Sequence, residues 1–173
     1  MLGEPTSLSE ARQLAHDDRY QFQWWALSLV KAKPLGGEAG GKSGKKGKDR
    51  GMDGVINFID DPKGRLSAAV VQVKSGHVKS GDIRDLVGTV QAEKAAMGVF
   101  LTLEPPTEEM KAEASKAGCY TSAVWGQSYP KIQVLTIDAL LGGAQVQMPP
   151  EASTFAKAQK VKGNQAKQGE LGL

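Results

Sequence analysis

The sequence predicts one mixed α/β domain with a central sheet that helices flank on both sides. Three observations predict this fold class. The chain has 173 residues and 40% of them are hydrophobic, which suffices for one core and is short for two. Segments with helical spacing alternate with short β-rich segments. The β-rich segments carry apolar residues at odd and even positions, a pattern typical of strands that are covered on both faces.

Residues 8–30 are expected to form two helices. Thr6 or Ser7 can cap the first helix, and Asp17 or Asp18 can open the second. The second helix carries an apolar face at helical spacing, made of Phe22, Trp25, Ala26 and Leu29. This face is expected to pack on the core, which makes packing a better explanation for the Trp pair than base stacking.

Residues 52–60 and 66–74 are β-rich and flank the turn sequence DPKGR, so they predict a hairpin. The next expected elements are a helix that Ser80 or Asp82 opens, with apolar spacing up to Met97, and a strand over 98–103. A second helix follows, which Thr107 caps and which ends near Gly118. The last expected elements are strands over 120–125 and 132–137 and a helical turn over 137–141.

Two stretches differ in composition from the rest of the chain. Residues 36–51 contain seven glycines, five Lys or Arg and two acids, which predicts a flexible basic loop. Residues 149–173 begin with a Pro-Pro pair and lose hydrophobic periodicity, which predicts a disordered tail. The folded domain is therefore expected to span residues 1–148. The net charge of +3 comes from these two stretches, since they carry +3 and +2 and leave the rest of the chain slightly acidic.

The composition also excludes some classes of protein. The single Cys119 excludes an internal disulfide framework, and His16 and His77 are too few for a Cys/His zinc site. No apolar run approaches the roughly 18 residues of a membrane span, and residues 1–10 lack the pattern of a secretory signal. We expect a soluble cytoplasmic protein with no membrane partner.

The residues that indicate chemistry lie on the predicted hairpin. Strand alternation places Gln72 and Lys74 on one face and directs Val73 to the other. Asp53 begins the partner strand. A turn centred near Lys63 sets Asp53 opposite about Val73, where its carboxylate can approach Gln72 and Lys74.

An acid, an amide oxygen and a lysine at one strand pair suit metal-assisted hydrolysis of a phosphodiester. Mg²⁺, or Mn²⁺ in its place, prefers hard oxygen ligands, which the side chains of Asp53 and Gln72 and the main-chain carbonyl of Val73 can supply. Lys74 is then expected to stabilise charge in the transition state or to orient the attacking water. The predicted catalytic residues are Asp53, Gln72 and Lys74.

Basic and polar residues beside this site are candidates for contacts with DNA phosphates. They are Lys42, Lys45, Lys46, Lys48, Arg50, Ser75 and His77. The alternative without DNA is that the five basic residues form a solubilising insertion, that Ser75 is a turn residue and that His77 is a solvated loop histidine. The position of the basic loop next to Asp53 favours the DNA interpretation.

The run GMDGVINF, followed by VVQVKSG, DIRDLVGTVQAEKAAMG and VFLTL, resembles the PD-(D/E)XK nuclease superfamily, specifically its Mrr-like branch with a Gln-x-Lys variant. FQWWALSLV, the Lys/Gly loop and GMDG are also similar to the restriction-endonuclease-like region C-terminal to some DNA methyltransferases. The resemblance covers about residues 20–142. It implies a restriction-endonuclease-like αβββαβ core with a central mixed sheet flanked by helices, a divalent metal and DNA as substrate. By the same resemblance, Asp53 matches the aspartate of the motif, Gln72 its second ligand and Lys74 its lysine.

The sequence departs from this pattern in three ways. Gln72 replaces an acid, which lowers the local negative charge. Only two strands are predicted before the central helix, where the family has three. Many relatives also supply a Glu from the first helix. The residues found near that place here are Gln21 and Gln23, with Glu10, Asp17 and Asp18 as possible substitutes.

Two functions follow from these residues. The first is a Mg²⁺-dependent DNA endonuclease of a restriction-modification system, for which a homodimer is expected because cutting both strands requires two active sites. The alternative is a catalytically inactive nuclease-like DNA-binding or specificity module associated with a DNA methyltransferase, and a purely structural role comes third. The run GGEAGGKS fits a nucleotide-binding loop by its letters. However, it lacks the strand before it and the helix after it, which disfavours ATP binding.

Overall fold

A computed structural model describes residues 3–35 and 51–150 of the chain. Its helices and strands, in chain order, are α1 (Leu8–Asp17), α2 (Arg19–Leu29), β1 (Lys33–Pro34), β2 (Gly54–Ile59), β3 (Leu66–Lys74), α4 (Ser80–Ala92), β4 (Met97–Thr102), α5 (Glu108–Lys116), β5 (Cys119–Thr121), β6 (Ser128–Pro130), β7 (Ile132–Thr136) and α6 (Ile137–Leu141). The loop predicted at 36–51 and the tail predicted at 149–173 lie outside the described residues, apart from Gly51, Pro149 and Pro150.

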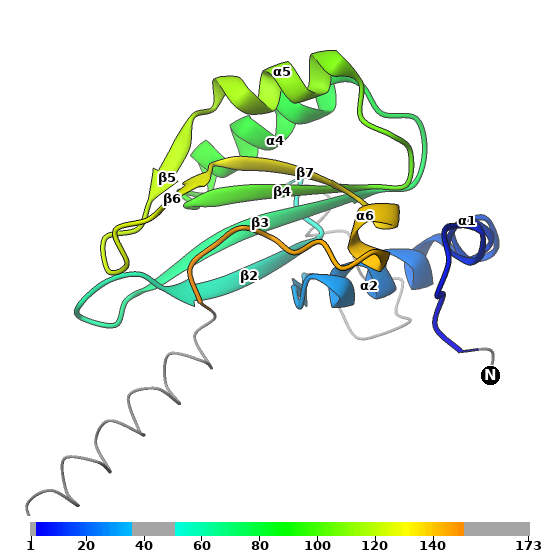
Figure 1. The fold of residues 1–173 in the computed structure, drawn as a ribbon, viewed down its shortest axis with the longest axis horizontal. Helices are drawn as coiled ribbons and strands as arrows, with labels where there is room; N and C mark the ends of the chain where they lie inside the picture. Colours follow the sequence, from blue (N-terminus) through cyan, green and yellow to red (C-terminus); the bar gives the residue numbers. More distant parts are fainter. Residues whose placement is uncertain (1–2, 36–50, 151–173) are drawn as a thin grey trace, which may run out of the picture.

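Five strands form a central mixed sheet in the order β1-β2-β3-β4-β7 (Figure 1). The β1–β2 and β2–β3 pairs are antiparallel, whereas β3–β4 and β4–β7 are parallel. β5 and β6 form a separate antiparallel hairpin. A parallel pair requires a long crossover connection, and α4 provides the one between β3 and β4. The predicted fold class, a mixed sheet flanked by helices, is confirmed.

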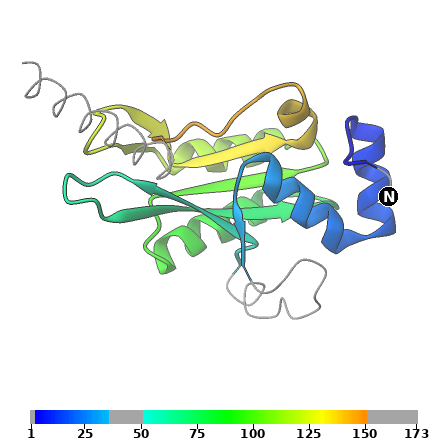
Figure 2. The same cartoon turned by 90° about the horizontal axis from the view of Figure 1, so that it is seen from below.

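Helices cover both faces of the sheet, as Figures 1 and 2 show. On one face, buried side chains of α1, α2 and α6 pack on Ile56, Phe58 and Val71. On the other face, α4 and α5 pack on Val70 and Phe100. Trp25 is buried on the α2 face, where its ring lies 6.0 Å from that of Phe22, so packing is confirmed as its role.

The element boundaries differ from the predicted ones in a few places. Lys79, rather than Ser80 or Asp82, is the N-cap of α4, and Asp82 occupies the third helical position. The helix ends at Ala92 because Lys94 adopts a positive φ of 54°, so Met97 begins β4 instead of continuing the helix. β1 supplies the third strand that the sequence pattern did not reveal. It contains two residues, one of them a proline, which is too short to produce a pattern.

In the residues described, none of the helices is long and apolar enough to cross a bilayer.

Candidate functional site

Asp53 lies immediately before β2, where its main chain and side chain both contact β3. Its N–H donates to the carbonyl of Val71 at 2.8 Å, and its Oδ2 accepts from the N–H of Val73 at 2.7 Å. The ladder pairs Gly54 with Val71, so the backbone of Asp53 lies level with Gln72, one residue from the predicted alignment. The carboxylate nevertheless reaches Val73 because the aspartate side chain extends along β3.

Gln72 and Lys74 lie on the face of the sheet that α4 covers. Alternation along β3 establishes this, because Val71 and Val73 pack against the α2 side and Val70 packs against the α4 side. The side-chain oxygen Oε1 of Gln72 is buried and has no hydrogen-bond partner among the described residues. An unpaired buried acceptor costs about 1–3 kcal/mol, so this oxygen is suited to receive a donor or a cation from outside the described residues.

Lys74 is engaged by a carboxylate of α4. Its Nζ donates to Oδ1 of Asp82 at 2.6 Å, while Oδ2 of Asp82 accepts from the N–H of Lys79 at 2.8 Å. Burial raises the pKa of Asp82, but the hydrogen bonds from Lys74 and Lys79 outweigh it and hold the pKa below its usual value. Asp82 therefore stays ionised and fixes the position of the Lys74 ammonium.

Sequence reasoning did not assign Asp82 to the site, since the residue was considered only as an opener of α4. The signal that could have identified it is topological. β3 ends at Lys74 and α4 begins at Ser80, so a short loop returns the first turn of α4 to the end of the strand. An acid in that turn lies next to the last side chain of β3 on the same face.

The three acids considered as substitutes for a first-helix glutamate make contacts close to themselves in the sequence, and one of them, Asp18, is the N-cap of α2. Glu10 accepts from the N–H of Thr6 at 2.7 Å. Asp17 accepts from the side chain of Gln13 at 2.9 Å, and Asp18 accepts from the N–H groups of Tyr20 and Gln21 at the start of α2. These contacts of the three acids are therefore local to the two helices.

For a divalent metal, the residues present offer oxygen donors with little negative charge. Gln72 and the Val73 carbonyl are oxygen donors of the right kind, but both are neutral, and Asp53 already uses Oδ2 to accept from Val73. Within residues 3–35 and 51–150, no three His, Cys, Asp or Glu side chains form a group that could hold an ion. Mg²⁺ is bound in proteins through one or two carboxylates together with waters and substrate phosphates, so a single carboxylate is the lower limit of such a ligand set.

Ser75 and His77 follow β3 into the loop that precedes α4. Ser75 lines a recess of about 230 Å³ together with Arg12 and His16 of α1, and His77 lines a neighbouring recess of about 310 Å³. Glu104 borders both recesses and pairs with Arg12 at 2.8 Å. The other predicted DNA contacts lie outside the described residues. They are Lys42, Lys45, Lys46, Lys48 and Arg50.

The sheet order, the helices on both faces and an Asp–Gln–Lys arrangement at the end of β3 define a restriction-endonuclease-like domain. Within this class, the chain belongs to the family of the NACHT-associated inactive Restriction Endonuclease 1, NA-iREase1, whose model matches residues 35–142.

Two solved structures share the fold. One is the MspJI restriction endonuclease in complex with a 27-mer oligonucleotide, with a TM-score of 0.52 and 11% identity over 78% of this chain and 29% of that chain. The other is the DNA modification-dependent restriction endonuclease AspBHI, with a TM-score of 0.54 and 13% identity over 82% of this chain and 35% of that chain. The chain thus spans about a third of the length of these two enzymes.

Proposed function

We propose that this chain is a restriction-endonuclease-like module that binds DNA without cutting it. The observation that carries the proposal is the charge of the site. Gln72 places a neutral amide where a second carboxylate would be needed, which leaves Asp53 as the only carboxylate on the β2–β3 strand pair at this end. The lysine that would stabilise a transition state is paired with Asp82 instead. The family description, which calls these domains inactive, supports the same conclusion.

DNA is the proposed ligand for two reasons. The two structural relatives are named as restriction endonucleases, and one of them is described with an oligonucleotide bound. In this chain, five Lys or Arg residues precede Asp53 within residues 36–51, and Ser75 and His77 follow Lys74. Such groups bind the phosphate backbone without recognising sequence. The family name points to a NACHT protein as the setting of the module, whereas association with a methyltransferase stays a prediction.

The test measures binding and cleavage on one preparation of the full chain. Retention of duplex DNA at low salt is expected, with loss of binding as salt rises. With Mg²⁺ or Mn²⁺, nicking of a supercoiled plasmid is expected to stay at the level of Asp53→Ala and Lys74→Ala. Absence of DNA binding at low salt would overturn the proposal.

A metal-dependent endonuclease is the second candidate, and the unpaired Oε1 of Gln72 favours it because a cation can satisfy that oxygen. Nicking by the wild type that disappears in both Asp53→Ala and Lys74→Ala would establish this activity. Gln72→Glu is the matched control for the effect of a negative charge at position 72. It is expected to bind Mn²⁺ measurably in calorimetric titration, whereas the wild type is not.

A further inference from the structure

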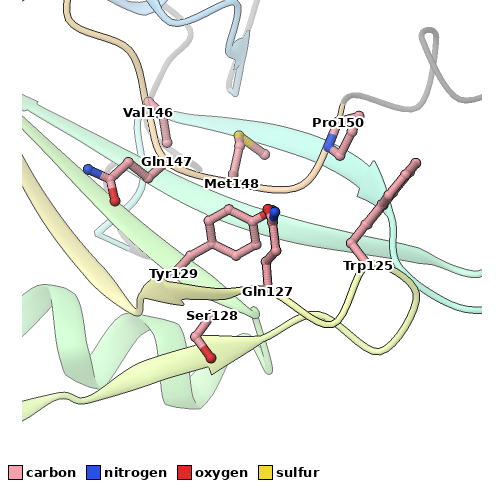
Figure 3. A pocket seen from close by; sticks show the side chains of 8 residues that line it. All are labelled: Trp125, Gln127, Ser128, Tyr129, Val146, Gln147, Met148 and Pro150. Atoms are coloured by element: carbon pink, nitrogen blue, oxygen red, sulfur yellow. The ribbon is translucent and has the colours of Figure 1, made fainter.

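The β5–β6 hairpin lies at the end of β2 remote from Asp53, where Asp60 accepts a hydrogen bond from Tyr120. A recess of about 450 Å³ separates this hairpin from the segment that follows α6 (Figure 3). Tyr129 in this recess already donates to Gln127 at 3.0 Å, and the lining carries no charged side chain among the described residues. The recess therefore offers no charge for a ligand to pair with.

A groove of different character, with a volume of about 420 Å³, lies between α4 and α5. The two helices lie side by side on one face of the sheet, as Figures 1 and 2 show. α4 lines the groove with four residues spaced i, i+3, i+4 and i+7, which form one stripe along the helix over about 10 Å. They are Arg84, Val87, Gly88 and Gln91. The start of β7, at the edge of the sheet opposite β1, completes the lining, so the groove lies apart from Asp53.

Gly88 faces this groove, and the fold of the chain does not require a glycine there. Its φ is not positive, and nothing lies within 4 Å of a Cβ added to it. A glycine inside a helix such as α4 destabilises the helix relative to alanine. What the missing side chain provides is room for a partner to approach the backbone of α4 closely.

Three cationic side chains surround the groove and share a single carboxylate. Arg84 and Lys116 both pair with Oε1 of Glu113, at 3.2 and 3.3 Å. Their side chains are 60% and 72% exposed, so further donors of both face solvent. Lys131 forms no ion pair within the described residues, and its N–H donates to the carbonyl of Gly118 at 3.0 Å, which fixes its main chain. The lining thus carries three positive charges and one negative charge.

The base of the groove, between these cations, is apolar. Val90 and Ile132 are 2% and 4% exposed there, and Val87 and Ala117 are half-buried beside them. An apolar base with a cationic rim matches an amphipathic helix whose apolar stripe is flanked by carboxylates. A groove between two neighbouring helices also has the shape into which a third helix packs.

We propose that the groove between α4 and α5 docks an amphipathic helix of an acidic protein partner. Apolar side chains of the partner rest on the base of the groove beside Gly88, and its carboxylates pair with the cationic rim. The two basic segments of this chain do not match the groove, because residues 36–51 and 149–173 carry net charges of +3 and +2. Duplex DNA matches the rim only, because its phosphate backbone has no apolar stripe to place on the base.

The experiment compares two synthetic peptides on the full chain, each about four helical turns long. Both carry Leu at positions i, i+3, i+4 and i+7, and the flanking positions are Glu in one peptide and Lys in the other. The wild type is expected to bind the Glu peptide about tenfold more tightly in fluorescence anisotropy, because only this peptide can pair with the rim. NMR signals of Gly88 and Lys131 are expected to shift with the Glu peptide.

Gly88→Leu fills the groove and is expected to weaken binding of the Glu peptide about tenfold. The variant is expected to fold, as urea denaturation will report, because open space surrounds the added Cβ and Leu favours helices. Lys131→Glu reverses one charge of the rim and is expected to cause a loss of similar size. Lys111→Glu is the matched control, since it changes the net charge equally at a 56% exposed position of α5 outside the groove. Its affinity for the Glu peptide is expected to stay near that of the wild type.

Equal affinity for the two peptides, or an unchanged affinity for the Glu peptide in either Gly88→Leu or Lys131→Glu, would overturn the proposal. So would duplex DNA that shifts the NMR signals of Gly88 and Lys131 while the Glu peptide does not. Retention of duplex DNA reports on the function proposed above and is expected to be the same in wild type and Gly88→Leu. The two proposals can therefore fail separately.

Discussion

Single residues decide both what the Asp53 site can do and how the remote hairpin is held. Gln72 and Asp82 set the charge around Lys74, and Asp60 receives four donors at the far end of β2. Burial raises the pKa of Asp60, but the hydrogen bonds from Ser122, Tyr120, Val124 and Ala123 outweigh it, so the pKa lies below its usual value. Burial, followed by the hydrogen bond to Asp60, raises the pKa of Tyr120 to about 12. The carboxylate is therefore the form that holds the hairpin.

Asp60→Asn is expected to lower the free energy of unfolding at pH 7 by about 2 kcal/mol, because hydrogen bonds to a charged group are lost. The folded-state pKa of Asp60 is depressed, so this stabilisation is present above the unfolded pKa of about 3.9 and is lost as pH falls through the folded value. The difference between wild type and variant in urea denaturation is thus expected to shrink below about pH 4. Asp138→Asn, at an exposed position of α6, is the control, and an equal loss in both variants would contradict the assignment.

At the scale of elements, the approach of α4 to the sheet positions Asp82 beside Lys74. β4 carries Gly98 where the helix crosses it. A Cβ at that position would lie 2.8 Å from Cγ2 of Val90, closer than real Cβ contacts, and 3.1 Å from Cγ of Leu86, tighter than most of them. The short distance between α4 and β4 therefore requires a glycine at position 98, since Val90 and Leu86 are both buried in the core.

Gly98→Ala is expected to destabilise the fold by about 1–3 kcal/mol in urea denaturation, because the added methyl overpacks the core. Gly88→Ala is the matched control on α4, since nothing lies within 4 Å of its added Cβ. That change is expected to stabilise the protein by roughly 0.5–1 kcal/mol through helix propensity. A neutral or stabilising effect of Gly98→Ala would show that α4 is free to move away from the sheet.

At the scale of the whole molecule, the net positive charge of the chain is concentrated in two stretches of the sequence, residues 36–51 and 149–173. Residues 36–51 carry five bases and two acids, while the chain outside residues 36–51 and 149–173 is slightly acidic. For the DNA-binding function proposed above, the positive charge of residues 36–51, which precede Asp53 in the sequence, is expected to attract nucleic acid even though the total charge is only +3.

Replacement of Lys42, Lys45, Lys46, Lys48 and Arg50 by Gln is expected to weaken duplex binding. Each lost phosphate contact reduces the slope of log affinity against log salt by about 0.9, so loss of several contacts lowers it by about 3–4. Fluorescence anisotropy over a salt series measures this slope. The control replaces Lys63 and Arg65, which lie in the β2–β3 turn at the end remote from Asp53, and is expected to leave the slope unchanged.

The sequence by itself determined the fold class and most elements, because apolar spacing reports local structure directly. The caps at Ser7, Asp18 and Thr107 follow from local hydrogen bonding and were predictable. β1 and the hairpin strand β6 were not, since two- and three-residue strands contain too little pattern.

The tertiary structure alone decided what surrounds the predicted site residues. Alternation placed Gln72 and Lys74 on one face, but the partner of Lys74 depends on where α4 returns to the sheet. The same holds for Asp60, whose four donors lie 60 to 64 residues further along the chain. Contacts over such separations are set by packing of whole elements, and no local pattern in the sequence records them.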